Sequence, residues 1–161
     1  MKLDWMGEYR DVVEALIHYC NIYAGVYRIE KMTYRDVRYS YAQIQVLEYL
    51  LENEERGDNM CSIARRLGIT RSNFTKITQR LVQKGLVEKK SLPGCRRDLC
   101  VEVTPFGREL YEDYSKGVFL RHFSSMFEEL EKLTPEARAY VRDALMAAMH
   151  SANKDRSDDS K

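Results

Sequence analysis

The chain has 161 residues, of which 44% are apolar and 32% charged, so one domain or one compact subunit with extensions can bury a core. No apolar run approaches the ~20 residues that a membrane span requires. Glu8, Arg10 and Asp11 interrupt the N-terminal stretch where a signal peptide would be apolar. We therefore expect a cytoplasmic protein with no membrane partner.

The formal net charge of +1 hides an uneven distribution of charge along the chain. Residues 61–97 contain ten basic residues and one acidic residue, Glu88, which gives this segment a formal charge of +9. The rest of the chain contains 16 basic and 24 acidic residues, a formal charge of −8. A basic module in an acidic frame favours a localised site for a polyanion, with a merely solvated basic face as the alternative.

The predicted elements of the first half are helices. Apolar residues at spacings of three and four predict a long amphipathic helix over residues 9–31. Ser40 is positioned to cap a second helix that extends to about residue 54. A short helix is predicted over residues 62–67, ending at Gly68, and Thr70 is positioned to cap a further helix that ends at residue 84, before Gly85.

The second half begins with strands and returns to helices. Residues 87–91 and 99–103 flank a Pro93-Gly94 turn and predict a hairpin. Thr104-Pro105 and Thr134-Pro135 each place an N-cap before a proline, which predicts helices over residues 105–130 and 135–150. Residues 151–161 are polar and are expected to form a flexible tail. The expected fold class is mainly α with a small β wing.

Residues 62–77 have the spacing of a helix-turn-helix. Ala64 is small enough for two helices to approach closely, Gly68 permits a positive φ at the turn, and Ile69 fills the corner. The inward stripe of the second helix is expected to comprise Phe74, Ile77, Thr78, Leu81 and Val82. The candidate DNA-binding residues on this helix are Arg71, Ser72, Asn73, Thr75, Lys76, Gln79 and Arg80.

This set of candidates combines cations with amide and hydroxyl groups and contains no acid. Such groups read base edges and phosphates in a major groove, where Asn73 and Gln79 fit bidentate contacts to adenine. The alternative, a solvated polar face, would more often contain Glu or Asp. The predicted hairpin adds four basic candidates for contacts to phosphates or to the minor groove: Lys89, Lys90, Arg96 and Arg97.

Together these segments resemble the MarR family of bacterial regulators over about residues 39–110. The resemblance is strongest in residues 63–70 (IARRLGIT), 81–87 (LVQKGLV) and 96–107 (RRDLCVEVTPFG). It implies a winged helix-turn-helix protein, a dimer of about six helices plus a two- or three-stranded hairpin. It also implies a repressor that binds a near-palindromic operator on double-stranded DNA as a homodimer and is modulated by a small aromatic effector or an oxidant.

The resemblance also implies a division of the chain. Residues 1–38 would form an N-terminal dimerisation helix and linker, 39–104 the DNA-binding lobe, 105–150 the C-terminal dimerisation helices and 151–161 the flexible tail. The apolar residues of the last two helices agree with a dimer, because they offer more apolar surface than a small winged core can cover. One departure concerns the wing: the family usually has an acid just before the wing arginine pair, and this chain has Cys95, so the wing is expected to be less firmly held.

Tyrosines are concentrated in the first two predicted helices and their linker. Four of them are candidate effector-binding residues, because phenol rings stack on aromatic ligands and donate hydrogen bonds: Tyr19, Tyr23, Tyr27 and Tyr39. A tyrosine-rich interface is the alternative. Cys20 lies among these residues and is the candidate for a redox-responsive regulator, with a reduced and inert thiol as the alternative.

The sequence lacks the usual motifs of catalytic sites. It has no phosphate-binding glycine loop, no metal-ligand spacing and no nucleophile motif, so we expect no enzyme, no metal site and no cofactor. The remaining alternative to a regulator is an architectural DNA-binding or protein-interaction winged helix without sequence specificity. Asn73, Thr75 and Gln79 favour the regulator, because a purely electrostatic binder needs only cations.

Overall fold

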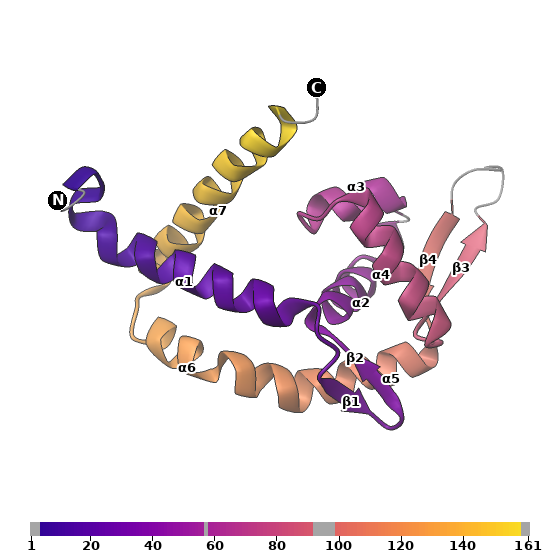
Figure 1. Cartoon of the computed structure of the whole chain (residues 1–161). Helices are drawn as coiled ribbons and strands as arrows, with labels where there is room; N and C mark the ends of the chain where they lie inside the picture. Colours follow the sequence, from indigo (N-terminus) through magenta and orange to yellow (C-terminus); the bar gives the residue numbers. More distant parts are fainter. Residues whose placement is uncertain (1–3, 57, 92–98, 159–161) are drawn as a thin grey trace. The chain divides into compact units, whose positions relative to one another are not determined.

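The computed structural model describes residues 4–56, 58–91 and 99–158 (Figure 1). The chain divides into two compact units, Met1–Tyr114 and Ser115–Lys161. The described helices and two small antiparallel hairpins give a mainly α fold with a β wing, as predicted. Within the described ranges, every helix is too short or too polar to cross a membrane.

The first long helix, α1 (Arg10–Tyr27), follows a 3-10 helix, η1 (Asp4–Tyr9). The predicted helix over residues 9–31 is therefore too long at its C-terminal end. The chain turns after Tyr27, where Ile29 N donates to Val26 O at 3.1 Å. No residue of α1 is buried, and several of its large apolar side chains, including Val12 and Ile22, are exposed.

A short hairpin that the sequence did not predict connects α1 to the next helix. Its strands are β1 (Met32–Tyr34) and β2 (Val37–Tyr39), which pair antiparallel with Met32 opposite Tyr39. Arg35 at the turn has a φ of +49°, a conformation that is uncommon outside glycine. The hairpin ends at Tyr39, which is almost completely buried.

The helix α2 (Tyr41–Glu52) begins where the sequence predicts it. Ser40 and Gln43 form a capping box, in which the Ser40 N–H donates to Gln43 Oε1 at 3.1 Å. A short 3-10 helix, η2 (Glu54–Arg56), follows α2, and then come α3 (Met60–Arg66) and α4 (Arg71–Gln83). The start of α3 lies upstream of the predicted residue 62 because Asn59 provides the N-cap.

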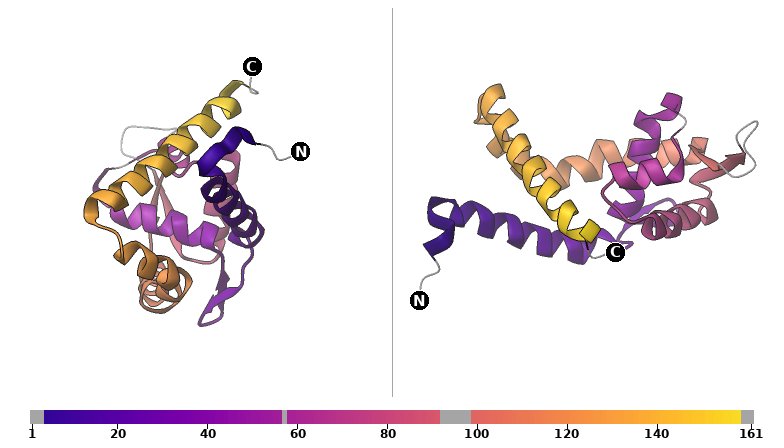
Figure 2. Two further views of the ribbon diagram at one scale, coloured as in Figure 1. Left: turned by 90° about the vertical axis from the view of Figure 1, so that its left-hand side faces the viewer. Right: turned by 90° about the horizontal axis from the view of Figure 1, so that it is seen from above.

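The strands β3 (Val87–Ser91) and β4 (Leu99–Val103) have the predicted bounds and pair antiparallel, with Val87 opposite Val103. Figure 2 (right) shows this hairpin projecting from the lobe formed by α2, α3 and α4. Thr104 then caps α5 (Pro105–Asp113) by accepting from Gly107 N at 3.1 Å. A Cβ at position 107 would lie 2.2 Å from Leu86 O, so this close approach requires glycine.

The core of the first unit lies where α2, α4, β3, β4 and α5 meet. Because each of these elements is amphipathic, their apolar faces pack against one another. The largest completely buried apolar side chains are Tyr39, Phe74, Leu47, Ile63, Leu81, Leu86 and Leu110. This core holds α3 and α4 in place and leaves the outer face of α4 to solvent.

The second unit is helical, and the single helix predicted over residues 105–130 is interrupted. A π-helical turn, η3 (Tyr114–Val118), separates α5 from α6 (Phe119–Glu131). A π turn inserts one residue into the helical repeat, and Gly117 within it is a poor helix former. The last helix, α7 (Pro135–Asp158), extends beyond the predicted end at His150, so residues 151–158 of the predicted tail are helical.

Candidate nucleic-acid interface

The segment from α3 to α4 has the local geometry expected of a helix-turn-helix. Asn59 Oδ1 accepts from Ser62 N at 3.0 Å at the start of α3. At the turn, Gly68 has a φ of +68°, and Ile69 N donates to Ala64 O at 3.0 Å. Thr70 then caps α4 by accepting from Asn73 N at 3.1 Å. Gly68 and Thr70 therefore have the structural roles that the sequence predicts.

The helix α4 has one buried and one exposed face. Phe74, Ile77, Thr78 and Leu81 are buried, and the Thr78 hydroxyl donates to Phe74 O at 2.9 Å. Val82, which was predicted to point inward, is 37% exposed because it lies at the edge of the apolar stripe. The expected inward stripe is therefore confirmed except at Val82.

The predicted contact residues share the outer face of α4. Arg71, Ser72, Lys76, Gln79 and Arg80 are exposed, and Asn73 and Thr75 are half-buried. The Thr75 hydroxyl already donates to Arg71 O at 2.9 Å, which leaves its oxygen as an acceptor. The side of α4 opposite its buried stripe thus offers cations, amides and hydroxyl groups.

The wing strands carry two of the four predicted wing contacts. Lys89 is exposed, and its side chain has no ion-pair partner among the residues that the structure describes. Lys90 instead pairs with Glu102 and lies 3.3 Å from Glu88 Oε1. Hydrogen bonds to these two carboxylates raise the pKa of Lys90. Arg96 and Arg97, together with Cys95 and the Pro93-Gly94 turn, lie outside the described residues.

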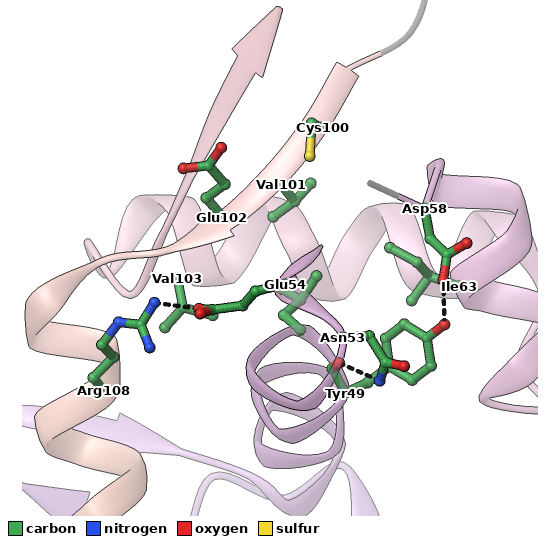
Figure 3. Close-up of a pocket in the computed structure, with 11 residues that line it drawn as sticks. Tyr49, Asn53, Glu54, Asp58, Ile63, Cys100, Val101, Glu102, Val103 and Arg108 are labelled. Atoms are coloured by element: carbon green, nitrogen blue, oxygen red, sulfur yellow. Dashed lines mark hydrogen bonds and ion pairs between the residues drawn. The ribbon is translucent and has the colours of Figure 1, made fainter. Parts of the chain in front are cut away.

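A cavity of about 270 Å³ lies beneath the wing, between the end of α2, β4 and α5 (Figure 3). Its charged side chains are paired: Arg108 with Glu54, Asp58 with the Tyr49 hydroxyl at 2.7 Å, and Glu102 with Lys90. The pair of Arg108 and Glu54 joins α5 to η2. Because these groups already satisfy one another, we interpret the cavity as part of the support of the wing.

The C-terminal end of α4 is anchored by a cluster that the sequence analysis missed. Lys84 Nζ lies 2.6 Å from Glu30 Oε1, 2.6 Å from Arg38 O and 3.2 Å from Gln43 Oε1. Gln43 Nε2 donates to Glu30 Oε1 at 3.0 Å. Burial raises the pKa of Glu30, but the hydrogen bonds and charge of Lys84 outweigh it and leave the pKa below its ordinary value.

The tyrosines predicted to bind an effector lie in two places. Tyr19, Tyr23 and Tyr27 follow one face of α1, with ring centroids 5.6 Å and 5.4 Å apart, and Tyr23 lies 6.1 Å from Tyr41. Burial, helped by the neighbouring tyrosines and Glu48, raises the pKa of Tyr23 to about 12. At neutral pH its phenol is therefore a hydrogen-bond donor.

Tyr39, the fourth predicted effector residue, packs edge-on against Tyr114 with ring centroids 6.4 Å apart. Only 1% of its surface is exposed, and its hydroxyl has no hydrogen-bond partner among the described residues. Burial raises the pKa of this phenol, so it too is protonated at neutral pH. An unpartnered buried donor of this kind is costly, and it is uncommon in folded proteins.

The predicted redox residue, Cys20, is exposed on α1 beside Tyr19. Cys61 is also exposed, and Cys100 is half-buried at the cavity beneath the wing. Within the described parts of the chain, the His, Cys, Asp and Glu side chains form no group of three or more that would hold a metal ion.

The sequence of the helix-turn-helix matches a known family. Residues 39–98 match the sequence profile of the MarR family. No curated protein sequence matches the chain significantly.

Solved structures share the fold over nearly the whole chain. The PcaV transcriptional regulator from Streptomyces coelicolor, solved with its natural ligand, is 20% identical, with a TM-score of 0.65 over 94% of this chain and 99% of that chain. Sco3205, a MarR family transcriptional regulator from Streptomyces coelicolor solved with DNA, is 20% identical, with a TM-score of 0.72 over 91% of this chain and 92% of that chain.

A third structure with this fold is FabT from Streptococcus pneumoniae, solved in complex with DNA. It is 15% identical, with a TM-score of 0.62 over 91% of this chain and 99% of that chain. The family match over the helix-turn-helix and the fold shared with these regulators agree with each other. Residues 39–98 thus match the MarR family, and the chain as a whole shares its fold with these solved regulators.

Proposed function

We propose that this protein is a sequence-specific transcriptional repressor that binds a near-palindromic operator on double-stranded DNA as a homodimer. The observation that carries the proposal is the outer face of α4, where exposed cations stand beside amide and hydroxyl groups and no acid occurs. These groups match the donors and acceptors of base edges in a major groove. Sco3205 and FabT, which share the fold, were solved with DNA, and this supports the same partner here.

The wing adds contacts to the DNA backbone in this proposal. Lys89 is exposed on β3 and fits a phosphate contact, as do Arg96 and Arg97 from the sequence between the strands. Lys90 contributes less, because its ammonium is already paired with Glu102 and Glu88. The backbone contacts set the register of the protein on the DNA, and α4 reads the bases.

The homodimer is supported by apolar surface on the helices outside the winged lobe. Large apolar side chains of α1 and α7 are exposed, including Ile17 and Ile22 on α1 and Val141, Leu145 and Met149 on α7. Apolar faces of this extent favour burial against a second copy. A two-fold axis would present two α4 helices to successive major grooves, about 34 Å apart on one face of the DNA.

A small aromatic effector is the proposed modulator, and the tyrosines carry this part of the proposal. Tyr19 and Tyr23 offer stacked rings, whereas Tyr27 is tilted against Tyr23 and already donates its hydroxyl hydrogen to Gln45 Oε1. Tyr39 has an unpartnered hydroxyl, which is buried in this structure. PcaV was solved with its natural ligand, which supports a ligand-responsive protein with this fold. The redox alternative rests on the exposed Cys20.

The experiment that tests the function is affinity selection of DNA fragments from a genomic library. A dimeric regulator recovers an inverted repeat with half-sites about one helical turn apart and prefers it over random DNA by roughly a thousand-fold or more. The double variant Lys76→Ala/Gln79→Ala should bind that repeat more weakly and fold normally. Lys132→Ala in the second unit is the control and should bind as the wild type does.

The same experiment separates the regulator from an architectural DNA-binding protein. An architectural protein would recover DNA without an enriched repeat, and its binding would weaken with salt equally for all sequences. Recovery of no enriched repeat would therefore overturn the proposed function. Equal affinity of the double variant and the wild type for the selected repeat would overturn the role of α4.

A further inference from the structure

A small cleft lies beside the outer face of α4, where the end of α1 and the start of α2 meet this helix. Its volume is about 140 Å³. Arg28, which directly follows α1, lines it together with Asn73, Lys76 and Arg80 of α4. Ser40, the N-cap of α2, and Gln43 complete the polar part of the lining. Three cations from two separate segments therefore surround one cleft.

These three cations differ from the other basic residues nearby. The side chains of Arg28, Lys76 and Arg80 form no hydrogen bond or ion pair with the residues described in the structure. Lys84, in contrast, is paired with Glu30. Like charges gathered around a cleft repel one another, so an anion bound in the cleft would stabilise their arrangement.

The carboxylate that would otherwise neutralise this site is held elsewhere. Glu30 lies near Arg80, whose charge contributes to the lowered pKa of Glu30. Its Oε1 atom accepts from Lys84 Nζ at 2.6 Å and from Gln43 Nε2 at 3.0 Å. The ion pair of Glu30 is with Lys84, and neither Arg28 nor Arg80 forms an ion pair with it, so both arginines remain available to an anion from outside the chain.

The size of the cleft limits what it can bind. A pocket for a drug-sized ligand holds roughly 300–1,000 Å³, about twice this volume or more. A single oxyanion needs much less space, and arginine and lysine side chains bind phosphate through charge-assisted hydrogen bonds. The amide of Asn73 supplies a further donor. The lining therefore fits a phosphate group better than an aromatic effector.

We propose that this cleft binds a phosphate of the DNA backbone, beside the major groove that α4 enters, and that Arg28 is a DNA-contacting residue. The inference rests on the proposed function, because Asn73 and Lys76 belong both to the cleft and to the outer face of α4. A duplex bound along α4 presents its backbone at the edge of this helix, so the occupant is a phosphate of the same DNA. Arg28 extends the interface beyond the helix-turn-helix and the wing.

The test compares Arg28→Gln with the wild type on the selected duplex and on random DNA, at about 0.1 to 0.3 M salt. Loss of one phosphate contact should weaken binding by roughly ten-fold. The logarithm of the DNA-binding constant falls linearly with the logarithm of the salt concentration, and the magnitude of this slope should decrease by about 1 in the variant. The preferred DNA sequence should not change. Arg28→Lys keeps the charge and should retain most of the slope. Arg10→Gln, near the other end of α1, is the charge-matched control and should leave both quantities unchanged.

Two results would overturn the proposal. Equal salt slopes for Arg28→Gln, Arg10→Gln and the wild type would show that Arg28 contacts no phosphate. Saturable binding of inorganic phosphate that is lost in Arg28→Gln, with the DNA slope unchanged, would assign the cleft to a free anion. The salt slope can be measured on any DNA duplex. If the protein showed no preference for one DNA sequence, the proposed function would be overturned, but the test of Arg28 would still be valid.

Discussion

At the scale of single residues, Tyr39 combines burial with a hydroxyl group that has no hydrogen-bond partner among the described residues. Desolvating such a group without a partner costs about 1–3 kcal/mol. The ring itself is well packed, with Tyr114 edge-on against it. The hydroxyl is therefore the destabilising part of this side chain, and the aromatic ring is the stabilising part.

Tyr39→Phe should raise the free energy of unfolding by up to about 1–3 kcal/mol, because it removes the unpartnered hydroxyl and keeps the ring. Urea denaturation of both proteins measures the difference. Tyr34→Phe is the control: Tyr34 is half-buried in the neighbouring strand, and its substitution should change the free energy by less than about 0.5 kcal/mol. A clear loss of stability in Tyr39→Phe would mean that the hydroxyl is hydrogen-bonded in the folded protein.

The sequence predicted the roles of single residues correctly where those roles depend only on neighbouring residues in the chain. Ser40, Thr70 and Thr104 were identified as N-caps because a cap depends on the few residues that follow it, and the structure confirms all three. The unpartnered hydroxyl of Tyr39 depends on what packs around it. Its neighbour Tyr114 is distant in sequence, so no local pattern indicates this feature.

At the scale of elements, regular and well-bounded segments were predictable. The hairpin formed by β3 and β4 has the predicted bounds, since both strands are five residues long and flank a turn. The hairpin formed by β1 and β2 was missed. Its strands are three residues long, too short to establish an alternating pattern, and its turn at Arg35 contains no glycine or asparagine.

The contact between Glu30 and Lys84 also escaped prediction, although it joins the segment after α1 to the end of α4. The two residues are 54 positions apart, and nothing in either local sequence indicates the partner. The pair lies 2.6 Å apart, and both side chains are mostly buried. We expect it to hold the C-terminal end of α4 in position.

Glu30→Gln should lower the free energy of unfolding by about 1–3 kcal/mol at pH 7, because it removes a charge-assisted hydrogen bond. The pKa of Glu30 is lowered in the folded protein, so its contribution is complete above the ordinary value of about 4.5 and is lost as pH falls through the folded-state pKa. The difference between the wild type and Glu30→Gln should therefore vanish in acid.

Urea denaturation at a series of pH values between about 3 and 8 measures this dependence. Glu55→Gln provides the control, because Glu55 is exposed in η2 and makes no ion pair with the described residues. Its effect on the free energy of unfolding should be small. A Glu30→Gln effect that persisted at pH 3 would show that Lys84 is not stabilised by the ionised carboxylate.

At the scale of the whole molecule, charge and apolar surface are distributed unequally. The basic residues are concentrated between positions 61 and 97, and this uneven charge was visible in the sequence because it needs only counting. The grouping of three cations around the cleft beside α4 could be predicted only in part. Lys76 and Arg80 follow from the helix, whereas Arg28 reaches the cleft only because the chain turns after Tyr27.

The apolar surface of α7 leads to a prediction about assembly. Val141, Leu145 and Met149 recur every four residues and are 40%, 50% and 45% exposed, so they form one stripe along the helix. Leu145→Glu places a charge in the middle of this stripe. If the stripe packs against a second copy, the variant should sediment with the mass of one chain, because burying an unpaired carboxylate costs several kcal/mol.

A matched control lies on the same helix. Asp143 points away from the stripe and pairs with Arg142 at 2.8 Å in solvent, so Asp143→Lys should remain dimeric although it changes the charge by more. Loss of the dimer should also weaken operator binding, since one chain reaches only one half-site. A Leu145→Glu protein that stayed dimeric and bound the operator normally would place the interface elsewhere, with the apolar face of α1 as the remaining surface to test in the same way.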